Sequence, residues 1–187
     1  MKKISFIGDS ILMVGYGDPV MNALKEEGYD AWRPEPNARF AQMTMRILKD
    51  DLERFKGSEI IHWNNGLHDQ VELFGDGAFT PLEQYVQTML RVSGYLKKYA
   101  KKVIFATTTP VHPDFPHHSF ERTKLYNDTL VPLLEKEGVI INDLFSAMVP
   151  HRIDGISEDL VHLNPLGIDV CAKQTLDVIH KTLSEIG

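Results

Sequence analysis

Three residues at opposite ends of the chain have the types that serine-based hydrolysis requires. Ser10 closes the tripeptide Gly8-Asp9-Ser10, and Asp159 precedes His162 by three residues. A serine hydroxyl is a weak nucleophile at neutral pH and needs an adjacent base, for which histidine is suited by its near-neutral pKa. A carboxylate can then hold the imidazole in one tautomer and stabilise its charged form. The pattern predicts Ser10 as nucleophile, His162 as general base and Asp159 as the orienting acid.

Each of these motifs also has a purely structural interpretation. Asp9 and Ser10 are residues that satisfy backbone groups in turns, and a solvated Asp159 beside a structural His162 would need no catalytic role. What favours chemistry is position, because Ser10 directly follows the first apolar run and His162 directly precedes the last helical stretch. In a parallel sheet, both places lie at the same edge.

Apolar runs alternate with helical stretches along the whole chain. Apolar runs typical of buried strands occur at 4–7, 29–32, 60–63, 103–106 and 139–141. Apolar residues at helical spacing occur at 17–28, 39–56, 81–100, 119–137 and 165–185. Strands that are apolar on both faces are typical of a parallel sheet covered by helices. We therefore expect one α/β domain over residues 1–187, a three-layer α/β/α sandwich around a five-stranded parallel sheet.

Two long loops follow strands of this predicted sheet, over residues 67–80 and 107–118. Long loops at the carboxyl ends of parallel strands commonly bind ligands. Phe74, Phe115 and His112 lie in these loops and are predicted to line a pocket, as Phe79 is, although most aromatic residues simply pack in cores. The loop histidines could also bind a metal, but their spacing matches no strong motif, and we expect no metal site.

The order and placement of these motifs resemble the SGNH, or GDSL-type, family of esterases and acylhydrolases. Gly8-Asp9-Ser10 resembles the first block of the family, and Asp159-x-x-His162 resembles its last block. The segment 65–69, which reads Asn-Gly-Leu-His-Asp, resembles the third block, and 107–110 also looks familiar from bacterial members. The resemblance implies a flavodoxin-like sheet of order 2-1-3-4-5 and metal-free, cofactor-free ester hydrolysis through an acyl-enzyme.

The resemblance also implies donors for the oxyanion that forms during attack on an ester. The Ser10 backbone N–H would be one donor, and Ala38, in Asn-Ala-Arg after the second strand, is the nearest match to the family's second-block glycine. The third block usually supplies an asparagine, where this chain has His68. An imidazole N–H can donate as well, and Asn65 or Asn64 is an alternative. Loss of one such donor costs about a hundredfold or more in rate.

Some remaining polar residues allow both a structural and a binding role. Asp9 and Asn64, which flank the strand ends, are predicted to contact substrate, whereas His62 lies between apolar neighbours and is expected to be a hydrogen-bonded core residue. Arg39 and Arg122 could bind an anionic group, although exposed ion pairing is the simpler interpretation.

Composition excludes several classes of protein. The net charge of -6 and pI of about 5.7 are unlike those of a nucleic-acid binder, which is usually basic. No apolar run is long enough to span a membrane, and the one after Lys2 and Lys3 is too short for a signal peptide, so we expect a cytoplasmic protein. A single cysteine, Cys171, cannot form an intrachain disulfide.

The sequence therefore predicts a carboxylic-ester hydrolase that acts on a small-molecule ester and removes a small acyl group, such as acetyl from a carbohydrate. Lysophospholipase-like or thioesterase-like activity is a variant of this prediction. The alternative, from a different functional class, is a protein that keeps the fold and binds a ligand without hydrolysing it. The departures from the family pattern at Ala38 and His68, in the second and third blocks, would be consistent with lost catalysis. A phosphate or nucleotide binder is disfavoured because no glycine-rich phosphate loop follows the first strand.

Overall fold

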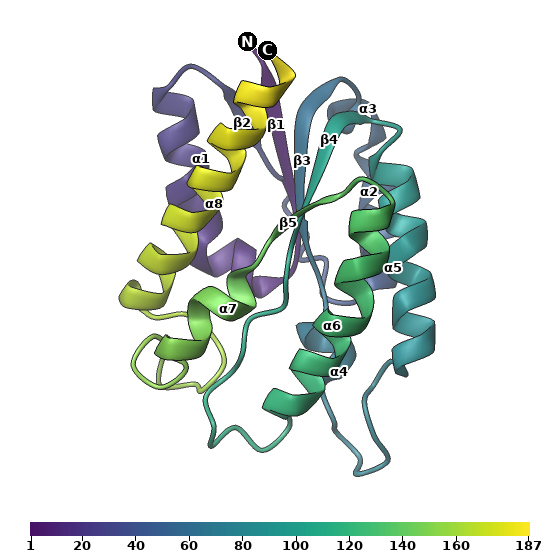
Figure 1. Cartoon of the computed structure of the whole chain (residues 1–187), viewed down its shortest axis with the longest axis vertical. Helices are drawn as coiled ribbons and strands as arrows, with labels where there is room; N and C mark the ends of the chain where they lie inside the picture. Colours follow the sequence, from purple (N-terminus) through teal and green to yellow (C-terminus); the bar gives the residue numbers. More distant parts are fainter.

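The chain folds as a parallel five-stranded sheet between two layers of helices (Figure 1). The computed structural model describes residues 1–187. The strands, in the spatial order β2-β1-β3-β4-β5, are β1 (Lys3–Ile7), β2 (Asp30–Trp32), β3 (Ser58–Asn64), β4 (Ala100–Ala106) and β5 (Ile140–Asn142). Every neighbouring pair is parallel. The predicted fold class and strand order are confirmed.

Helices cover both faces of the sheet (Figure 1). One face carries α1 (Gly17–Glu26), α7 (Leu144–Met148) and α8 (Pro165–Ile186). The other face carries α2 (Ala41–Asp50), α3 (Leu52–Phe55), α5 (Leu82–Leu96) and α6 (Phe120–Lys136). Right-handed crossovers between parallel strands produce this arrangement, because each connecting helix must pack back onto the sheet. No helix is both long and apolar enough to cross a membrane.

Two apolar cores lie on the two sides of the sheet. Phe6 and Ile104 belong to the core under α1 and α8, whereas Ile7, Trp63 and Phe105 belong to the core under α2, α5 and α6. Adjacent residues of a strand thus point into different cores, which explains why the strands are apolar throughout. Full burial of one such side chain contributes roughly 1.5–3 kcal/mol, more than an exposed ion pair at about 0–1 kcal/mol. The cores therefore hold the sheet in place.

The segment predicted as one helix over 39–56 is broken at Asp51, where α2 ends and α3 begins. Asp51 has φ -103° and ψ 20°, outside the helical range. The break turns Phe55 into the core, where it is fully buried and its ring centroid lies 4.9 Å from that of Trp32. Burial of this aromatic ring offsets the lost helical hydrogen bonds, which is a tertiary effect that local periodicity does not contain.

Four short elements replace segments expected to be loop or turn. They are a π-helical turn at Leu12–Tyr16, the single-turn α4 (Leu67–Gln70), α7 and a 3-10 turn at Val149–His151. A periodic pattern needs a window of about 11 residues or more to be recognised, so elements of three to five residues escape it. Both α4 and the π-helical turn are close to predicted site residues, and they fix the backbone there.

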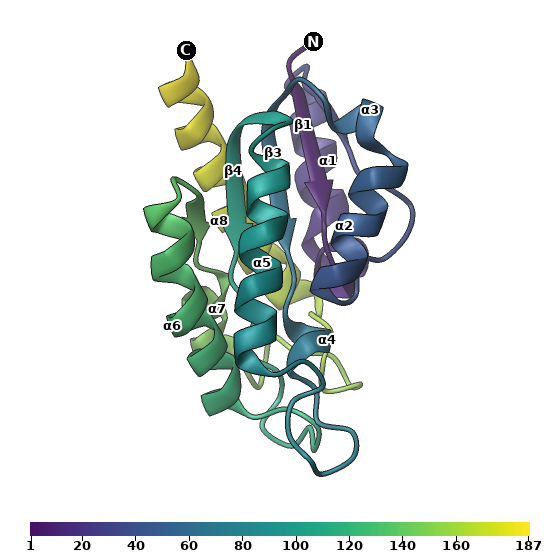
Figure 2. The same cartoon turned by 90° about the vertical axis from the view of Figure 1, so that its right-hand side faces the viewer.

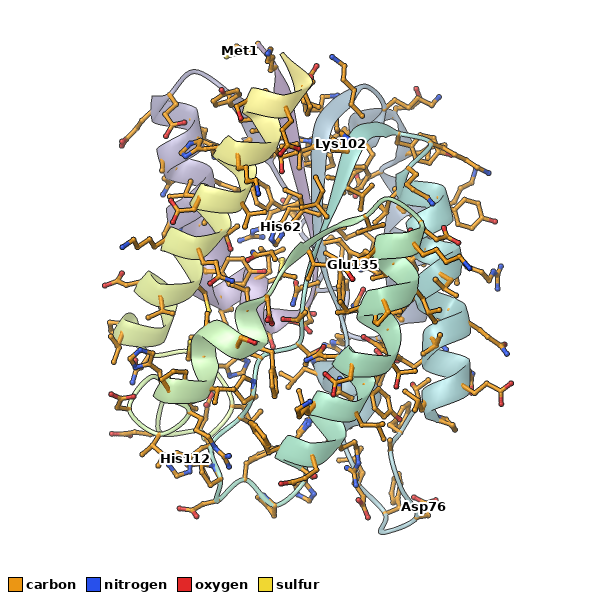
Figure 3. All side chains as sticks on the ribbon, viewed as in Figure 1. Met1, His62, Asp76, Lys102, His112 and Glu135 are labelled. Atoms are coloured by element: carbon orange, nitrogen blue, oxygen red, sulfur yellow. The ribbon has the colours of Figure 1, made fainter.

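The carboxyl ends of all five strands lie at one edge of the sheet, away from the two termini (Figure 2). Figure 3 shows Asp76 and His112 at this end of the molecule and Met1 and Lys102 at the opposite end. His62 lies between these ends, inside the molecule, and is fully buried. The parallel topology thus brings the two loops predicted to bind ligand to the same end of the molecule as Ser10, which lies shortly after β1.

Candidate active site

Ser10 is held at the sheet edge by a tight turn that follows β1. A Cβ atom on Gly8 would lie 1.7 Å from Asn64 Oδ1, so the close approach of β1 and β3 requires glycine here. Asp9 Oδ1 accepts hydrogen bonds from the Ile11 N–H at 3.0 Å and from Asn64 Nδ2 at 2.8 Å. These contacts tie the turn to the end of β3 and leave the Ser10 side chain only partly buried.

Asp9 and Asn64 do not line the cavity at Ser10, contrary to the prediction that they contact substrate. Both are buried, and their side chains bind each other behind the serine. Burial raises the pKa of Asp9 to about 6, against the opposing effect of the hydrogen bonds from Asn64 and Ile11. Their contribution in this geometry is to fix the Ser10 turn.

The structure brings Ser10, His162 and Asp159 together in a continuous hydrogen-bonded series. His162 Nε2 lies 2.9 Å from Ser10 Oγ, and His162 Nδ1 lies 2.6 Å from Asp159 Oδ2. With Asp159 ionised, Nδ1 carries the proton and Nε2 is free to accept the serine proton. Residues separated by about 150 positions in sequence therefore adopt the geometry that a general base and its nucleophile need.

The second oxygen of Asp159 fixes the carboxylate itself. Asp159 Oδ1 accepts from the backbone N–H groups of Val161 and His162 and from Ser157 Oγ, each at 2.9 Å. Burial acts to raise the pKa of Asp159, but the hydrogen bonds from His162, Val161 and Ser157 together hold that pKa well below its usual range. Asp159 is thus a carboxylate at any pH near neutrality.

Ser157 is a site residue that the sequence analysis missed. Its Oγ also lies 2.9 Å from the His162 carbonyl oxygen, so its single proton can bond either this oxygen or Asp159 Oδ1, and its backbone N–H donates to the same carbonyl at 2.7 Å. Leu160, between them, has φ 67°, and its carbonyl accepts from the His112 N–H at 3.0 Å. No spacing rule distinguishes such a serine from any other polar loop residue, so sequence offered no signal for it.

A cavity of about 250 Å³ opens at Ser10 Oγ and His162. Apart from these two, its lining is mostly apolar and comes from α4, the two long loops, the residue before α2 and the loop that carries Asp159 and His162. The lining residues are Phe40, Leu67, His68, Val71, Leu73, Phe115, His118 and Val161. The predicted Phe115 and His68 are present, as is His118, one of the loop histidines considered from sequence, whereas the five other aliphatic and aromatic neighbours were not singled out.

His68 and His118 give this cavity its remaining polar groups. Burial lowers the pKa of His68, and the nearby Arg39 and His162 add to the effect. Burial likewise lowers the pKa of His118 to about 4. Both imidazoles are therefore neutral at pH 7, and each has one ring N–H to donate. The His68 ring, set edge-on against Phe40, makes no hydrogen bond within the protein.

Of the four predicted oxyanion donors, two remain free in the structure. The Ser10 backbone N–H has no partner within the chain, and the His68 ring faces the same cavity. The Ala38 N–H is directed away, because it donates to the Gly8 carbonyl at 2.9 Å. Asn65 is also engaged, since its Nδ2 donates to the Arg39 carbonyl at 3.2 Å. Ala38 and Asn65 are therefore structural in this geometry.

Two residues predicted to contact substrate lie outside the Ser10 cavity. Phe74 is 80% exposed in the loop before α5 and does not line the cavity. His112 does not line it either, and its Nδ1 accepts from the Asp114 N–H at 3.2 Å. Both residues lie in the loops that wall the cavity, but their side chains do not reach it. The direction of a side chain within a loop depends on turns that sequence periodicity does not report.

The chain was compared with known proteins by sequence and by structure. No protein-family model matches the chain, and no curated protein matches it in sequence. Solved structures do match. The acetyl xylan esterase AlAXEase superposes with a TM-score of 0.78 at 21% identity over 95% of this chain and 99% of the other. Axe2, an acetylxylan esterase from Geobacillus stearothermophilus, gives 0.78 at 18% over 95% and 94%.

A GDSL-like lipase from Bacteroides thetaiotaomicron superposes with a TM-score of 0.75 at 17% identity over 96% of this chain and 88% of the other. The chain has the fold of the GDSL-like hydrolases. This agrees with the resemblance of the three sequence motifs to that family, and the GDSL-like fold places Ser10 and His162 at its carboxyl edge. At these identities the similarity concerns the fold, and the chemistry must be argued from the site.

Proposed function

We propose that this GDSL-like protein is a serine carboxylic-ester hydrolase that removes a small acyl group, such as acetyl, from a carbohydrate or another small ester. The observation that carries the proposal is the hydrogen-bonded series Ser10–His162–Asp159 at the mouth of a small apolar cavity. Nucleophile, base and orienting acid are the three roles that ester cleavage by serine requires.

The proposed reaction proceeds in two halves. Ser10 Oγ attacks the ester carbonyl while His162 Nε2 takes its proton, giving a tetrahedral oxyanion. Collapse breaks the bond to the alcohol, which leaves with the proton from His162, and the acyl group remains on Ser10. Water then attacks this ester with His162 as base, and a second collapse releases the acid and restores the serine hydroxyl. Asp159 stabilises the imidazolium in both halves.

The free donors at the cavity support stabilisation of the oxyanion. The Ser10 N–H is without a partner, and a neutral His68 can donate from its ring. Donors that are already in place when the charge develops need no reorganisation, which is the basis of their large effect. In this proposal His68 performs the task that an asparagine performs in most members of the family.

The cavity supports a small acyl group. A volume of about 250 Å³ lies just below the usual range for a ligand pocket, roughly 300–1,000 Å³, and most of its lining is apolar. An acetyl group fits such a space, whereas a long acyl chain would extend out of it. Two of the similar structures are named acetyl xylan esterases, which agrees with this assignment.

The test compares the wild type with Ser10→Ala in p-nitrophenyl acetate hydrolysis and in labelling by a fluorophosphonate. We expect wild-type turnover and labelling at Ser10, and a loss of at least about a thousandfold in the variant. Hydrolysis that persists in Ser10→Ala would exclude Ser10 as nucleophile. No turnover and no labelling of the wild type would favour the alternative of a binding protein without catalysis.

A further inference from the structure

A second hollow, of about 560 Å³, lies next to the Ser10 cavity and shares one wall with it. Phe40 lines both spaces. The rest of the hollow comes from the first turns of α2 and α5 and from the end of the loop before α5, where Phe79 and Thr80 lie. The two spaces are therefore neighbours across the Phe40 side chain.

The hollow contains an exposed aromatic surface in a fixed position. The rings of Phe40 and Phe79 are stacked, with centroids 4.8 Å apart and planes 29° apart, and Phe79 is 51% exposed. The backbone around Phe79 is anchored, because its N–H donates to the Val71 carbonyl and the Thr80 N–H donates to the Asp69 carbonyl, both at 2.8 Å. Such a ring offers a flat apolar face that its stacking on Phe40 and these backbone bonds hold in place.

Side-chain amides border this aromatic face. Gln42 at the start of α2 and Gln84 at the start of α5 both line the hollow, and neither makes a hydrogen bond within the protein. Each amide can donate and accept. The one cation of the hollow, Arg46, is paired with Asp50 at 2.8 Å. The Nη groups of Arg46 stay free to donate, but Asp50 balances its charge, so the hollow has two uncharged amides and no unpaired charge, which suits hydroxyl groups better than phosphate or carboxylate.

The two spaces thus differ in the chemistry they can accept. The 250 Å³ cavity is small and mostly apolar, whereas the 560 Å³ hollow combines a flat aromatic face with amide donors and acceptors. A sugar ring has an apolar C–H face and a rim of hydroxyls, which matches the second combination. We infer that the Phe40–Phe79 hollow binds the alcohol part of the ester, a glycosyl ring lying on Phe79, while the acyl group occupies the cavity at Ser10. This inference rests on the proposed function.

The first experiment compares two acetate esters in steady-state kinetics, a mono-acetylated methyl glycoside and ethyl acetate, which has no ring to lie on Phe79. For Phe79→Ala we expect KM for the glycoside ester to rise about tenfold, corresponding to about 1.4 kcal/mol, with ethyl acetate kinetics changed less than twofold. Phe79→Trp keeps an aromatic face, so its KM for the glycoside ester should stay close to the wild-type value. Tyr95→Ala, which removes an exposed aromatic ring on the distant part of α5, is the matched control.

Gln84→Ala provides an independent variant, because Gln84 is exposed and its loss does not disturb the aromatic pair. We expect a severalfold rise in KM for the glycoside ester alone. An equal loss on both esters in Phe79→Ala would mean that the ring only supports the Ser10 cavity, and would overturn the inference. A selective loss on p-nitrophenyl octanoate, with the glycoside ester unaffected, would also overturn it, because the hollow would then hold an acyl chain.

A binding measurement separates this inference from the proposed function. NMR titration of Ser10→Ala with the unacetylated methyl glycoside should show shifts at Phe79 and Gln84 that disappear in Ser10→Ala/Phe79→Ala. Binding through Phe79 without hydrolysis by the wild type would contradict the esterase proposal and leave a sugar site. Hydrolysis by the wild type, with glycoside binding that is absent or indifferent to Phe79, would contradict the inference alone.

Discussion

The two oxygens of the Asp159 carboxylate do different things. Oδ1 accepts three hydrogen bonds that hold the loop together, and Oδ2 accepts one from His162 Nδ1. An amide oxygen in the Oδ1 place can still accept the three structural bonds. An amide nitrogen in the Oδ2 place would donate instead, and would favour the tautomer of His162 that cannot act as base at Ser10.

We therefore expect Asp159→Asn to keep the fold and to lose kcat by about three to four orders of magnitude. Steady-state kinetics on p-nitrophenyl acetate, with thermal unfolding alongside, measure the two effects separately. Asp154→Asn is the matched control, because Asp154 pairs with His151 at the same three-residue spacing in a neighbouring loop. A kcat of Asp159→Asn within tenfold of the wild-type value would show that catalysis does not depend on the charge of the Asp159 carboxylate.

His68 stands in the third block, one of the two places where this chain departs from the GDSL-type pattern that its motifs resemble, and two substitutions separate its possible roles. If its ring donates to the oxyanion, His68→Ala should lower kcat about a hundredfold or more, with a smaller effect on KM. His68→Asn introduces the donor that most family members have and should recover a large part of the loss. Equal kcat in both variants would assign His68 to packing against Phe40.

At the scale of elements, one ion pair ties the loop after α4 to the start of α6, next to the point where the two long loops that wall the cavity meet. Arg122 in the first turn of α6 is paired with Glu72 and also donates through Nη1 to the Gln70 carbonyl at 3.1 Å. The Glu72 N–H donates to the His117 carbonyl at 2.9 Å, and His117 Nδ1 lies 3.0 Å from the Glu72 carbonyl. The loop after α4 and the loop after β4 are thus fastened together beside the cavity.

Arg122→Ala should loosen both loops while leaving the triad in place. We expect faster backbone hydrogen exchange in residues 71–80 and 107–118, and a severalfold rise in KM with a smaller change in kcat, because the cavity walls would be less ordered. Arg33→Ala removes another partly buried arginine, paired with Asp18, and serves as control. Exchange in both loops at wild-type rates would show that Arg122 does not fasten them.

How far the sequence predicts the structure also depends on scale. The strands could be expected because buried parallel strands have a strong apolar signal, and the proximity of Ser10 to His162 because the carboxyl ends of such strands share an edge. The strand order was implied only by the resemblance to the GDSL-type family. The oxyanion donors could not, because whether Ala38 or Asn65 faces the cavity depends on hydrogen bonds to Gly8 and Arg39, which lie at a distance in the chain. Ser157 had no sequence signal at all.

At the scale of the whole molecule, the buried turn at Ser10 affects stability through Asp9. Its pKa is raised to about 6 because the carboxylate is desolvated. Below pH 3.8 the carboxyl is protonated in the folded and unfolded states alike. As pH rises from about 4 to 6, the unfolded state gives up the proton more readily, so the free energy of unfolding falls. The penalty is complete above pH 6, and two pKa units correspond to a value on the order of 3 kcal/mol.

Asp9→Asn removes this penalty, because an amide oxygen can accept the hydrogen bonds of Ile11 and Asn64 without carrying charge. The difference in unfolding free energy between the variant and the wild type should therefore increase by as much as about 3 kcal/mol, in favour of the variant, between pH 4 and pH 7.5. Urea unfolding at four pH values across this range measures it. Asp76→Asn, at an exposed loop position, should show no such pH dependence. A constant difference for Asp9→Asn would mean that Asp9 is charged at no cost, so that the turn holding Ser10 would be more open to water than its burial implies.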